Sequence, residues 1–565
     1  MNSIVLLLVG LGIFALGYFV YSKFLGKRIF QLDPDFSTPA HELKDGVDYV
    51  PTNKYILWGH HFTSVAGAAP IAGPAVAVIW GWLPAFLWVT LGTIFFAGMH
   101  DFGALWASAR NRGKSIGSLS ERYIGKRGAS LFLVIIFVLL LMVLMAFAVI
   151  IKDLLISNPE AVIPSWGAIV VALLVGQAVY RYRMNLIAVT VIGVVALYAL
   201  ILLGDAFPIV LPDPILGMSP ATFWILALML YSAIASLLPV WVLLQPRDYI
   251  NGVQLFIGLG ILFGAVLLSA PTVVAPSWNT AVPEGTPSLV PLLFVTIACG
   301  AISGFHGLVS SGTTSKQLDK EPDARFVGYF GAVGEGLLAL GAILATTAGF
   351  KTVAEWESVY TAFNEGGVGA FVSGGGAIVS DGLGLPASLA ATVLATMTIL
   401  FAATTLDTGV RLHRFVIQEI GESFGWKVGK YTATVIVVGL VLALTFSQGL
   451  EGEGGLRIWP LFGTTNQLMA SLTLSILAVI LLRKRRNPWP ALIPLVFVFV
   501  MSFYAAIVQL QSLTADGDWL LLVIDIVIII AAVWVAVEAI GAMRRARIDE
   551  PEALDADAAY SSRNR

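Results

Sequence analysis

The sequence predicts an all-α polytopic membrane protein with about fifteen transmembrane helices. Of its 565 residues, 58% are hydrophobic and only 12% are charged, whereas roughly 25% of the residues of a soluble globular protein are charged. Most of the surface must therefore face lipid rather than water. The net charge of −2 gives no electrostatic support for a nucleic-acid partner.

Apolar runs of about 20 residues, the length that crosses ~30 Å of hydrocarbon, recur along the whole chain. The predicted spans are 3–24, 55–80, 83–109, 129–151, 163–180, 185–204, 221–244, 252–274, 289–312, 326–350, 386–410, 430–448, 456–482, 488–510 and 517–541. The first is a retained helix rather than a signal peptide, because no basic segment precedes it and no small-residue cleavage site follows. Residues 364–385 are so rich in glycine that an outside or re-entrant loop is expected there. The polar tail, 549–565, is expected to be disordered.

The distribution of Lys and Arg supports this count and orients the chain. With the N-terminus outside and the C-terminus inside, alternate loops hold 30 of the 33 basic residues, and only Lys152, Lys351 and Arg457 are exceptions. Cytoplasmic loops are enriched in Lys and Arg, and one missed helix would scramble the pattern downstream of it. The sequence therefore favours an N-out/C-in arrangement.

Ionisable side chains inside spans are costly and are therefore candidates for function. Asp101, Glu335 and His61 are candidates to carry a coupling proton, and His61 and His306, which lie in the predicted cytoplasmic half, are candidates to contact substrate. A purely structural hydrogen bond is the alternative for each. No phosphate-binding loop, nucleophile elbow or metal-ligand spacing appears, so we expect no enzyme activity and no cofactor.

Asp407 precedes Arg411 by four residues near the cytoplasmic end of a span. That spacing predicts an ion pair on one helix face, which could be either a gate or a plain structural contact.

Three spans contain residues that interrupt helices. GHHFTSVAGAAPIAGP (59–74) has Gly67, Ala68, Pro70 and Gly73 near its centre, and 221–244 contains Pro239. The third span, 289–312, carries CGAISGFHGLVSSGTTS (299–315), which is dense in glycine and hydroxyl residues. Pro removes a backbone donor and Gly permits non-helical backbone, and interrupted helices mark the binding sites of many transporters. Close packing of small residues is the alternative. The substrate-binding candidates are His61, Gly67, Ala68, Pro70, Gly73, Pro239, Trp241 and His306, and the hydroxyl candidates for a cation site, Na⁺ included, are Ser310, Ser311, Thr313 and Thr314.

Several segments resemble the carbon starvation protein A (CstA) family of bacterial transporters. They include GMHDFGALWASARNRGKSIG (98–117), YSAIASLLPVWVLLQPRDYI (231–250), TTLDTGVRL (404–412) and IWPLFGTTNQLMA (458–470), together with 59–74 and 294–331. The resemblance implies a multi-pass protein of the bacterial inner membrane that takes up pyruvate or peptides. It also implies the five-plus-five inverted repeat of the amino acid–polyamine–cation superfamily, with a second repeat expected to start at 221–244.

The sequence thus predicts four regions: an N-terminal helix and loop (1–54), a ten-helix transport core (55–410), four peripheral helices (411–548) and the tail. We expect a secondary transporter that imports a small carboxylate such as pyruvate by symport with H⁺ or Na⁺. Peptide uptake is the alternative. A membrane nutrient sensor is disfavoured, because no segment outside the membrane is long enough for a signalling domain.

Overall fold

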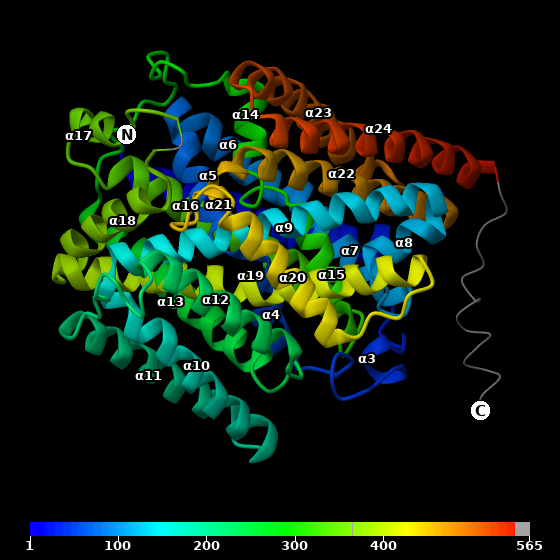
Figure 1. The fold of residues 1–565 in the computed structure, drawn as a ribbon, viewed down its shortest axis with the longest axis horizontal. Coiled ribbons are helices and arrows are strands. Elements are labelled where there is room, and N and C mark those ends of the chain that lie inside the picture. Colours follow the sequence, from blue (N-terminus) through cyan, green and yellow to red (C-terminus); the bar gives the residue numbers. More distant parts are fainter. Residues whose placement is uncertain (364, 549–565) are drawn as a thin grey trace.

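The computed structural model describes residues 1–363 and 365–548, and these residues form an all-helical bundle (Figure 1). The first half contains α1 (Ser3–Leu16), α2 (Ser22–Phe24), α3 (Pro39–Glu42), α4 (Lys54–Ala66), α5 (Ala69–Ala77), α6 (Trp82–Gly92), α7 (Gly98–Arg110), α8 (Ile116–Tyr123), α9 (Lys126–Ser157), α10 (Val162–Gly176), α11 (Leu186–Ala206), α12 (Pro220–Leu237) and α13 (Leu244–Ser269). The second half contains α14 (Leu289–Thr296), α15 (Gly304–Gly312), α16 (Phe330–Ala348), α17 (Val353–Val359), α18 (Gly367–Leu383), α19 (Ala387–Ser423), α20 (Lys430–Thr445), α21 (Glu453–Arg457), α22 (Trp459–Arg483), α23 (Trp489–Asp516) and α24 (Trp519–Ile548). Short π-helical segments join α1 to α2 (Gly17–Tyr21) and α6 to α7 (Thr93–Ala97), and another (Arg325–Tyr329) leads into α16. The predicted disordered tail lies outside the described residues.

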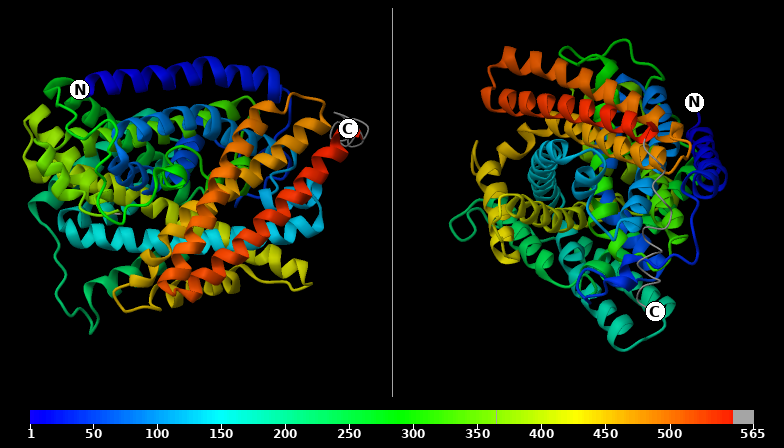
Figure 2. Two further views of the ribbon diagram at one scale, coloured as in Figure 1. Left: turned by 90° about the horizontal axis from the view of Figure 1, so that it is seen from above. Right: turned by 90° about the vertical axis from the view of Figure 1, so that its right-hand side faces the viewer.

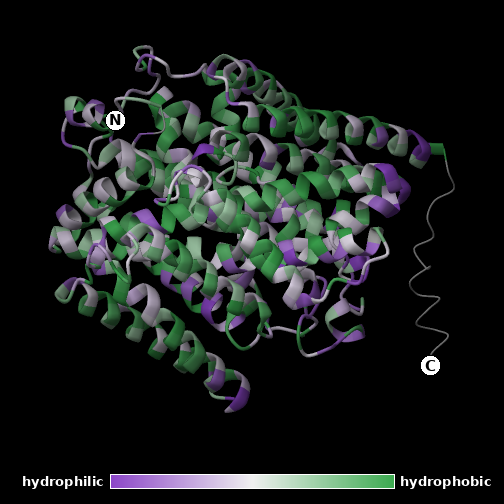
Figure 3. Cartoon of the chain, in the orientation of Figure 1, coloured by the Kyte–Doolittle hydropathy of each residue, from purple (hydrophilic) through white to green (hydrophobic). Residues whose placement is uncertain are grey.

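Helices occupy all fifteen predicted spans. In the described part of the chain, twelve continuous helices are long and apolar enough to cross a membrane, and α4 with α5 forms a thirteenth span bent by 46°. The other two predicted spans are α20, which is shorter, and the interrupted pair α14–α15. Figure 3 shows that the helices at the edges, such as α10, α11, α23 and α24, are largely hydrophobic.

The two sets of loops lie at opposite ends of the bundle, as the alternation of spans requires. Glu321 forms an ion pair with Arg110 and accepts a hydrogen bond from the N–H of Asp33, and Arg411 forms an ion pair with Asp48, so four of the basic segments meet at one end. Backbone hydrogen bonds join the other set of loops: 1–3 with 271–273, 80–83 with 276–279, and 274–275 with 347. We refer to the first end as the cytoplasmic end, following the charge distribution, and to the second as the outer end.

The segment expected as an outside or re-entrant loop at 364–385 is helical over Gly367–Leu383, so the expected loop conformation was wrong, although both ends of the segment are on the outer side. α16 runs to the outer end and α19 runs back from it, so α18 begins and ends on the outer side. A Cβ on Gly374 would lie 2.2 Å from the carbonyl oxygen of Ala345. The glycines thus allow α18 to pack closely on α16 across the outer end of the bundle.

The helix in the span predicted at 221–244 ends before Pro239, so the expected interruption is the end of the helix rather than a break within it. α12 ends at Leu237, and Pro239 lies in the connection to α13. The second interrupted helix is α14–α15, which lies within the span 289–312 that was also predicted to be interrupted. α13 packs on α4 as α22 packs on α15, and α12 packs on α9 as α20 packs on α19. From this matched packing we infer an inverted repeat whose second half begins at α14, with α10 and α11 at the edge of the bundle (Figures 1 and 2).

Candidate functional site

The two interrupted helices meet close to their breaks. Gly67 separates α4 from α5 with φ +54°, a conformation that L side chains rarely adopt. A Cβ on Gly73 would lie 2.4 Å from the carbonyl oxygen of Thr296, where α14 ends, and one on Gly300 would lie 3.3 Å from Cγ of Pro74. Gly67 therefore permits the break, while Gly73 permits close packing, which was the alternative interpretation.

Backbone groups freed by the breaks are hydrogen-bonded by side chains of neighbouring helices. Thr405 on α19 donates through Oγ1 to a carbonyl in the last turn of α4 at 3.2 Å. Asn466 on α22 accepts from the backbone N–H of Phe305 at 2.9 Å. Gln467 donates to the carbonyl of Phe294 at 2.5 Å. Interrupted backbone inside a membrane is tolerated only with such partners, so α19 and α22 stabilise the breaks.

A chain of two histidines and two carboxylates lies beside the breaks. His100 Nδ1 is 2.7 Å from Asp101 Oδ1, and His306 Nδ1 is 2.9 Å from Asp101 Oδ2. His306 Nε2 is 3.0 Å from Glu335 Oε2. All four side chains are buried, and they come from α7, α15 and α16. The structure thus brings together three of the predicted residues, Asp101, His306 and Glu335.

The geometry makes the His306–Glu335 contact a site for one proton. When Asp101 is ionised, it accepts a hydrogen from Nδ1 of each imidazole, so both rings carry that proton. His306 Nε2 and Glu335 Oε2 approach to 3.0 Å without the alignment of a hydrogen bond, so one proton can reside on either group, and both forms contain the same number of protons. Without that proton, a nitrogen lone pair would face a buried carboxylate, which is strongly unfavourable.

His61 lies next to this chain, on the last full turns of α4. Its Nδ1 is 3.0 Å from Oγ1 of Thr314, and a Cβ on Gly331 would lie 2.8 Å from its Cδ2. Gly331 is one helical turn before Glu335, so the imidazole edge packs on α16 close to the proton site. His61 Nε2 is buried and has no hydrogen-bond partner among the described residues.

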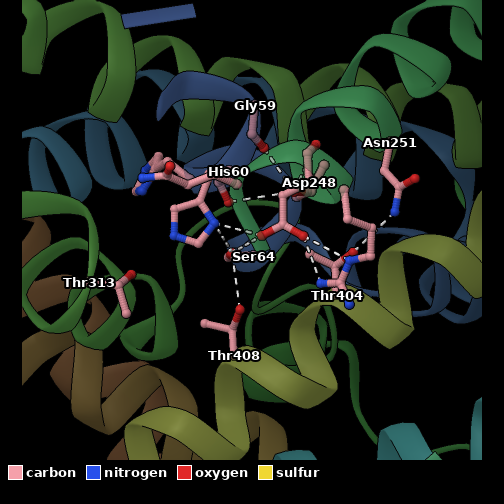
Figure 4. A network of polar contacts seen from close by, with 12 residues as sticks. Gly59, His60, Ser64, Asp248, Asn251, Thr313, Thr404 and Thr408 are labelled. Atoms are coloured by element: carbon pink, nitrogen blue, oxygen red, sulfur yellow. Dashed lines mark hydrogen bonds and ion pairs between the residues drawn. The ribbon is translucent and has the colours of Figure 1, made fainter. Parts of the chain in front are cut away.

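A second buried network surrounds His60 (Figure 4). His60 Nδ1 is 2.6 Å from Asp248 Oδ2. The hydroxyl of Ser64 lies 3.4 Å from the same oxygen and 3.2 Å from the hydroxyl of Thr408. The network therefore connects α4 with α13 and α19.

Arg247 extends this network with charge. Its Nε donates to Asp248 Oδ1 at 3.0 Å, and its two terminal nitrogens donate to the carboxylate of Asp407. One of them also donates to the hydroxyl of Tyr231 at 2.5 Å. A fully buried guanidinium is tolerated only with such complete pairing.

The predicted ion pair between Asp407 and Arg411 does not form. Asp407 contacts Arg247, whereas Arg411 donates to Asp48 at 2.9 Å and to the carbonyl of Leu238. The reason is tertiary: α13 and the 23–54 segment bring stronger partners to the two side chains than their neighbours on α19.

Pro239 and Trp241 do not reach the interrupted helices. Both lie in the connection after α12, and the Trp241 ring packs at 6.3 Å from Tyr180, near the cytoplasmic end. The structure therefore does not bring them to the breaks, and their assignment to the substrate site stays a prediction. Ala68 and Pro70, in contrast, are buried at the break, with Pro70 in the first turn of α5, where its missing N–H costs no hydrogen bond.

One of the four predicted hydroxyl residues forms a hydrogen bond with a residue of the candidate site. Thr314 contacts His61. Ser311 donates to the carbonyl of Gly307 and accepts from the N–H of Ile116, so it faces α8, and Thr313 donates to a carbonyl of its own helix. Ser310 Oγ is buried without a partner among the described residues.

Sequence reasoning missed Arg247, Asp248 and Asn466. The first two were assigned to a loop because the apolar runs on either side left 245–251 as a gap. Two features of the sequence could have indicated this network. They are the charged pair Arg247-Asp248 between two apolar runs and the pair His60-His61 within another predicted span. Asn466 stands in one of the segments that carry the family resemblance, but its role depends on an N–H that only the break in α14–α15 leaves free.

Comparison with known proteins gives a family for the chain. Residues 2–359 and 346–505 match the family described as "Carbon starvation protein CstA". The peptide transporter CstA of Bacillus subtilis is 31% identical over 94% of this chain and 97% of its own length. The peptide transporter CstA of Campylobacter jejuni is 31% identical over 90% of this chain and 80% of its own. The pyruvate/proton symporter BtsT of Escherichia coli is 29% identical over 90% of this chain and 82% of its own length.

Proposed function

Because the chain belongs to the CstA family of carbon starvation proteins, we propose that it is a secondary transporter that imports a small carboxylate such as pyruvate together with a proton. The observation that carries the coupling is the contact between His306 and Glu335, which holds one proton in a buried chain beside the interrupted helices. A pyruvate/proton symporter among its relatives supports both parts of the proposal.

The coupling follows from charge. A proton on the His306–Glu335 pair adds one positive charge to a buried site, and a carboxylate substrate adds one negative charge. Within a few ångströms and at low dielectric, each ion stabilises the other, so each raises the affinity for its partner. His306 is on α15, which begins directly after the break, so substrate in contact with the break would sense the protonation state.

The space beside the breaks favours a small substrate. A cavity of about 50 Å³ is lined by Ala69 at the start of α5 and by Thr296 and Cys299 at the break in α14–α15. That is room for roughly three or four water molecules, which suits a three-carbon acid better than a peptide. Peptide uptake remains the second candidate function, since relatives from Bacillus subtilis and Campylobacter jejuni carry the name peptide transporter.

The proposal is tested with purified protein in proteoliposomes. We expect radiolabelled pyruvate to accumulate under an inward H⁺ gradient and not under a Na⁺ gradient alone. Uptake of the dipeptide alanyl-alanine, measured in the same way, tests the peptide alternative. Glu335→Gln should reduce accumulation at least about fivefold while pyruvate exchange at equal pH continues. Glu357→Gln, an exposed carboxylate on α17, is the matched control and should behave like the parent protein. Uptake that follows Na⁺ alone, or full accumulation by Glu335→Gln, would refute the coupling site.

A further inference from the structure

A cavity of about 650 Å³ opens at the cytoplasmic end, between the N-terminal helix and the starts of α4 and α16. Four basic residues line it: Lys23, Lys27, Lys54 and Arg325. Asp323 is the single carboxylate in its wall. The cavity therefore carries an excess of three positive charges.

None of the four basic side chains forms an ion pair with the described residues. Arg325 lies over the ring of Tyr18 at 4.9 Å, and Lys54 lies over the ring of Tyr55 at 5.3 Å. These contacts orient the cations without neutralising them. An excess of cations in one hollow fits an anionic ligand.

The hollow is amphipathic and adjoins lipid. Tyr18, Tyr55 and Phe326 form part of its wall, next to the basic residues. The N-terminal helix lies along the edge of the bundle (Figure 2), where Leu16 and Val20 are 65% and 63% exposed. A ligand with an anionic head and apolar chains matches both surfaces, because its chains can lie along this helix.

We propose that this cavity binds the headgroup of an anionic phospholipid of the inner leaflet, with its phosphate between Arg325 and the lysines. Basic pockets between membrane helices on the cytoplasmic side suit such headgroups. Lys54 is the first residue of α4, which carries His60 and His61, and Arg325 begins the helical segment that continues to Glu335. A bound lipid therefore joins the start of α4, whose His61 lies beside the candidate proton site, to the segment leading into α16, which carries Glu335 of that site.

The test uses the full chain, delipidated in detergent and titrated with phosphatidylglycerol by native mass spectrometry. Lys27→Gln/Arg325→Gln should bind phosphatidylglycerol about thirtyfold more weakly, from two charges near the headgroup. Lys126→Gln/Arg127→Gln removes two exposed charges from the same end but outside the cavity and should bind normally. Lys27→Arg/Arg325→Lys keeps the charge and should retain the lipid, which excludes misfolding as the cause.

Equal weakening in both charge-removing variants would overturn the proposal, because diffuse attraction of the surface would explain it. So would unchanged binding in Lys27→Gln/Arg325→Gln. Millimolar inorganic phosphate is the second arm. We expect it to leave phosphatidylglycerol bound, whereas complete displacement would assign the cavity to free phosphate.

Discussion

Gly67→Ala should destabilise the protein by about 2–6 kcal/mol. Gly67 has φ +54°, and forcing an L side chain into a sparsely populated backbone region costs about 1–3 kcal/mol. The new Cβ would also lie 2.5 Å from Cε2 of Phe147 and 2.9 Å from Oγ1 of Thr405. Overpacking of this kind costs about 1–3 kcal/mol more, and Thr405 would have to give up its hydrogen bond to the end of α4.

The free energy of unfolding is measured by titration with SDS in mixed micelles. Gly260→Ala is the matched control, because Gly260 lies on the exposed side of α13 and a Cβ there would meet nothing within 4 Å. That control should be neutral or more stable by up to about 1 kcal/mol. Pyruvate uptake should fall in Gly67→Ala only. Equal stability of the two variants would show that glycine backbone freedom is not what permits the break.

Other side chains provide three more tests. In double-mutant cycles of unfolding free energies, Asp407→Asn should show a coupling energy of about 1–3 kcal/mol with Arg247→Gln and a smaller one with Arg411→Gln. A larger coupling energy with Arg411→Gln would instead support the Asp407–Arg411 ion pair that the sequence predicted. Asp101→Asn keeps the shape of the side chain but can accept through only one oxygen, so proton-driven uptake in proteoliposomes should fall at least about fivefold, and full accumulation would remove Asp101 from the proton path. Burial lowers the pKa of Lys316, which lies outside the spans. Between that lowered pKa and the ordinary lysine value of about 10.5, the unfolded chain binds more protons than the folded chain. The free energy of unfolding therefore rises with pH across that window. Lys316→Met should therefore flatten the dependence of unfolding free energy on pH there, and an unchanged slope would contradict the burial argument.

The accuracy of the sequence predictions followed the range of the interactions involved. The positions of the helices and the break at Gly67 depend on local composition and backbone freedom, and both predictions are confirmed. The prediction of a loop conformation at 364–385 was wrong, because packing of α18 on α16 outweighs the low helix propensity of glycine. Asp407 is a second example of a long-range contact that the sequence did not predict. The spacing of four residues predicts Arg411 as its partner on the same helix, but Arg247 from another helix forms the ion pair instead.

By itself, the sequence determined that this chain crosses the membrane many times, which loops share an end, and where α4 and α5 separate. These features follow from transfer energies, charge asymmetry and backbone sterics, all of which are encoded within a few consecutive residues. Only the tertiary structure decided that Asp101, His306 and Glu335 form one chain, that Arg247 lies between two carboxylates, and that Asn466 stabilises a break on another helix. The contacts of Asp101 with His306, of Arg247 with Asp407 and of Phe305 with Asn466 each join residues more than a hundred positions apart. In the low dielectric of the interior, each depends on which helices pack together.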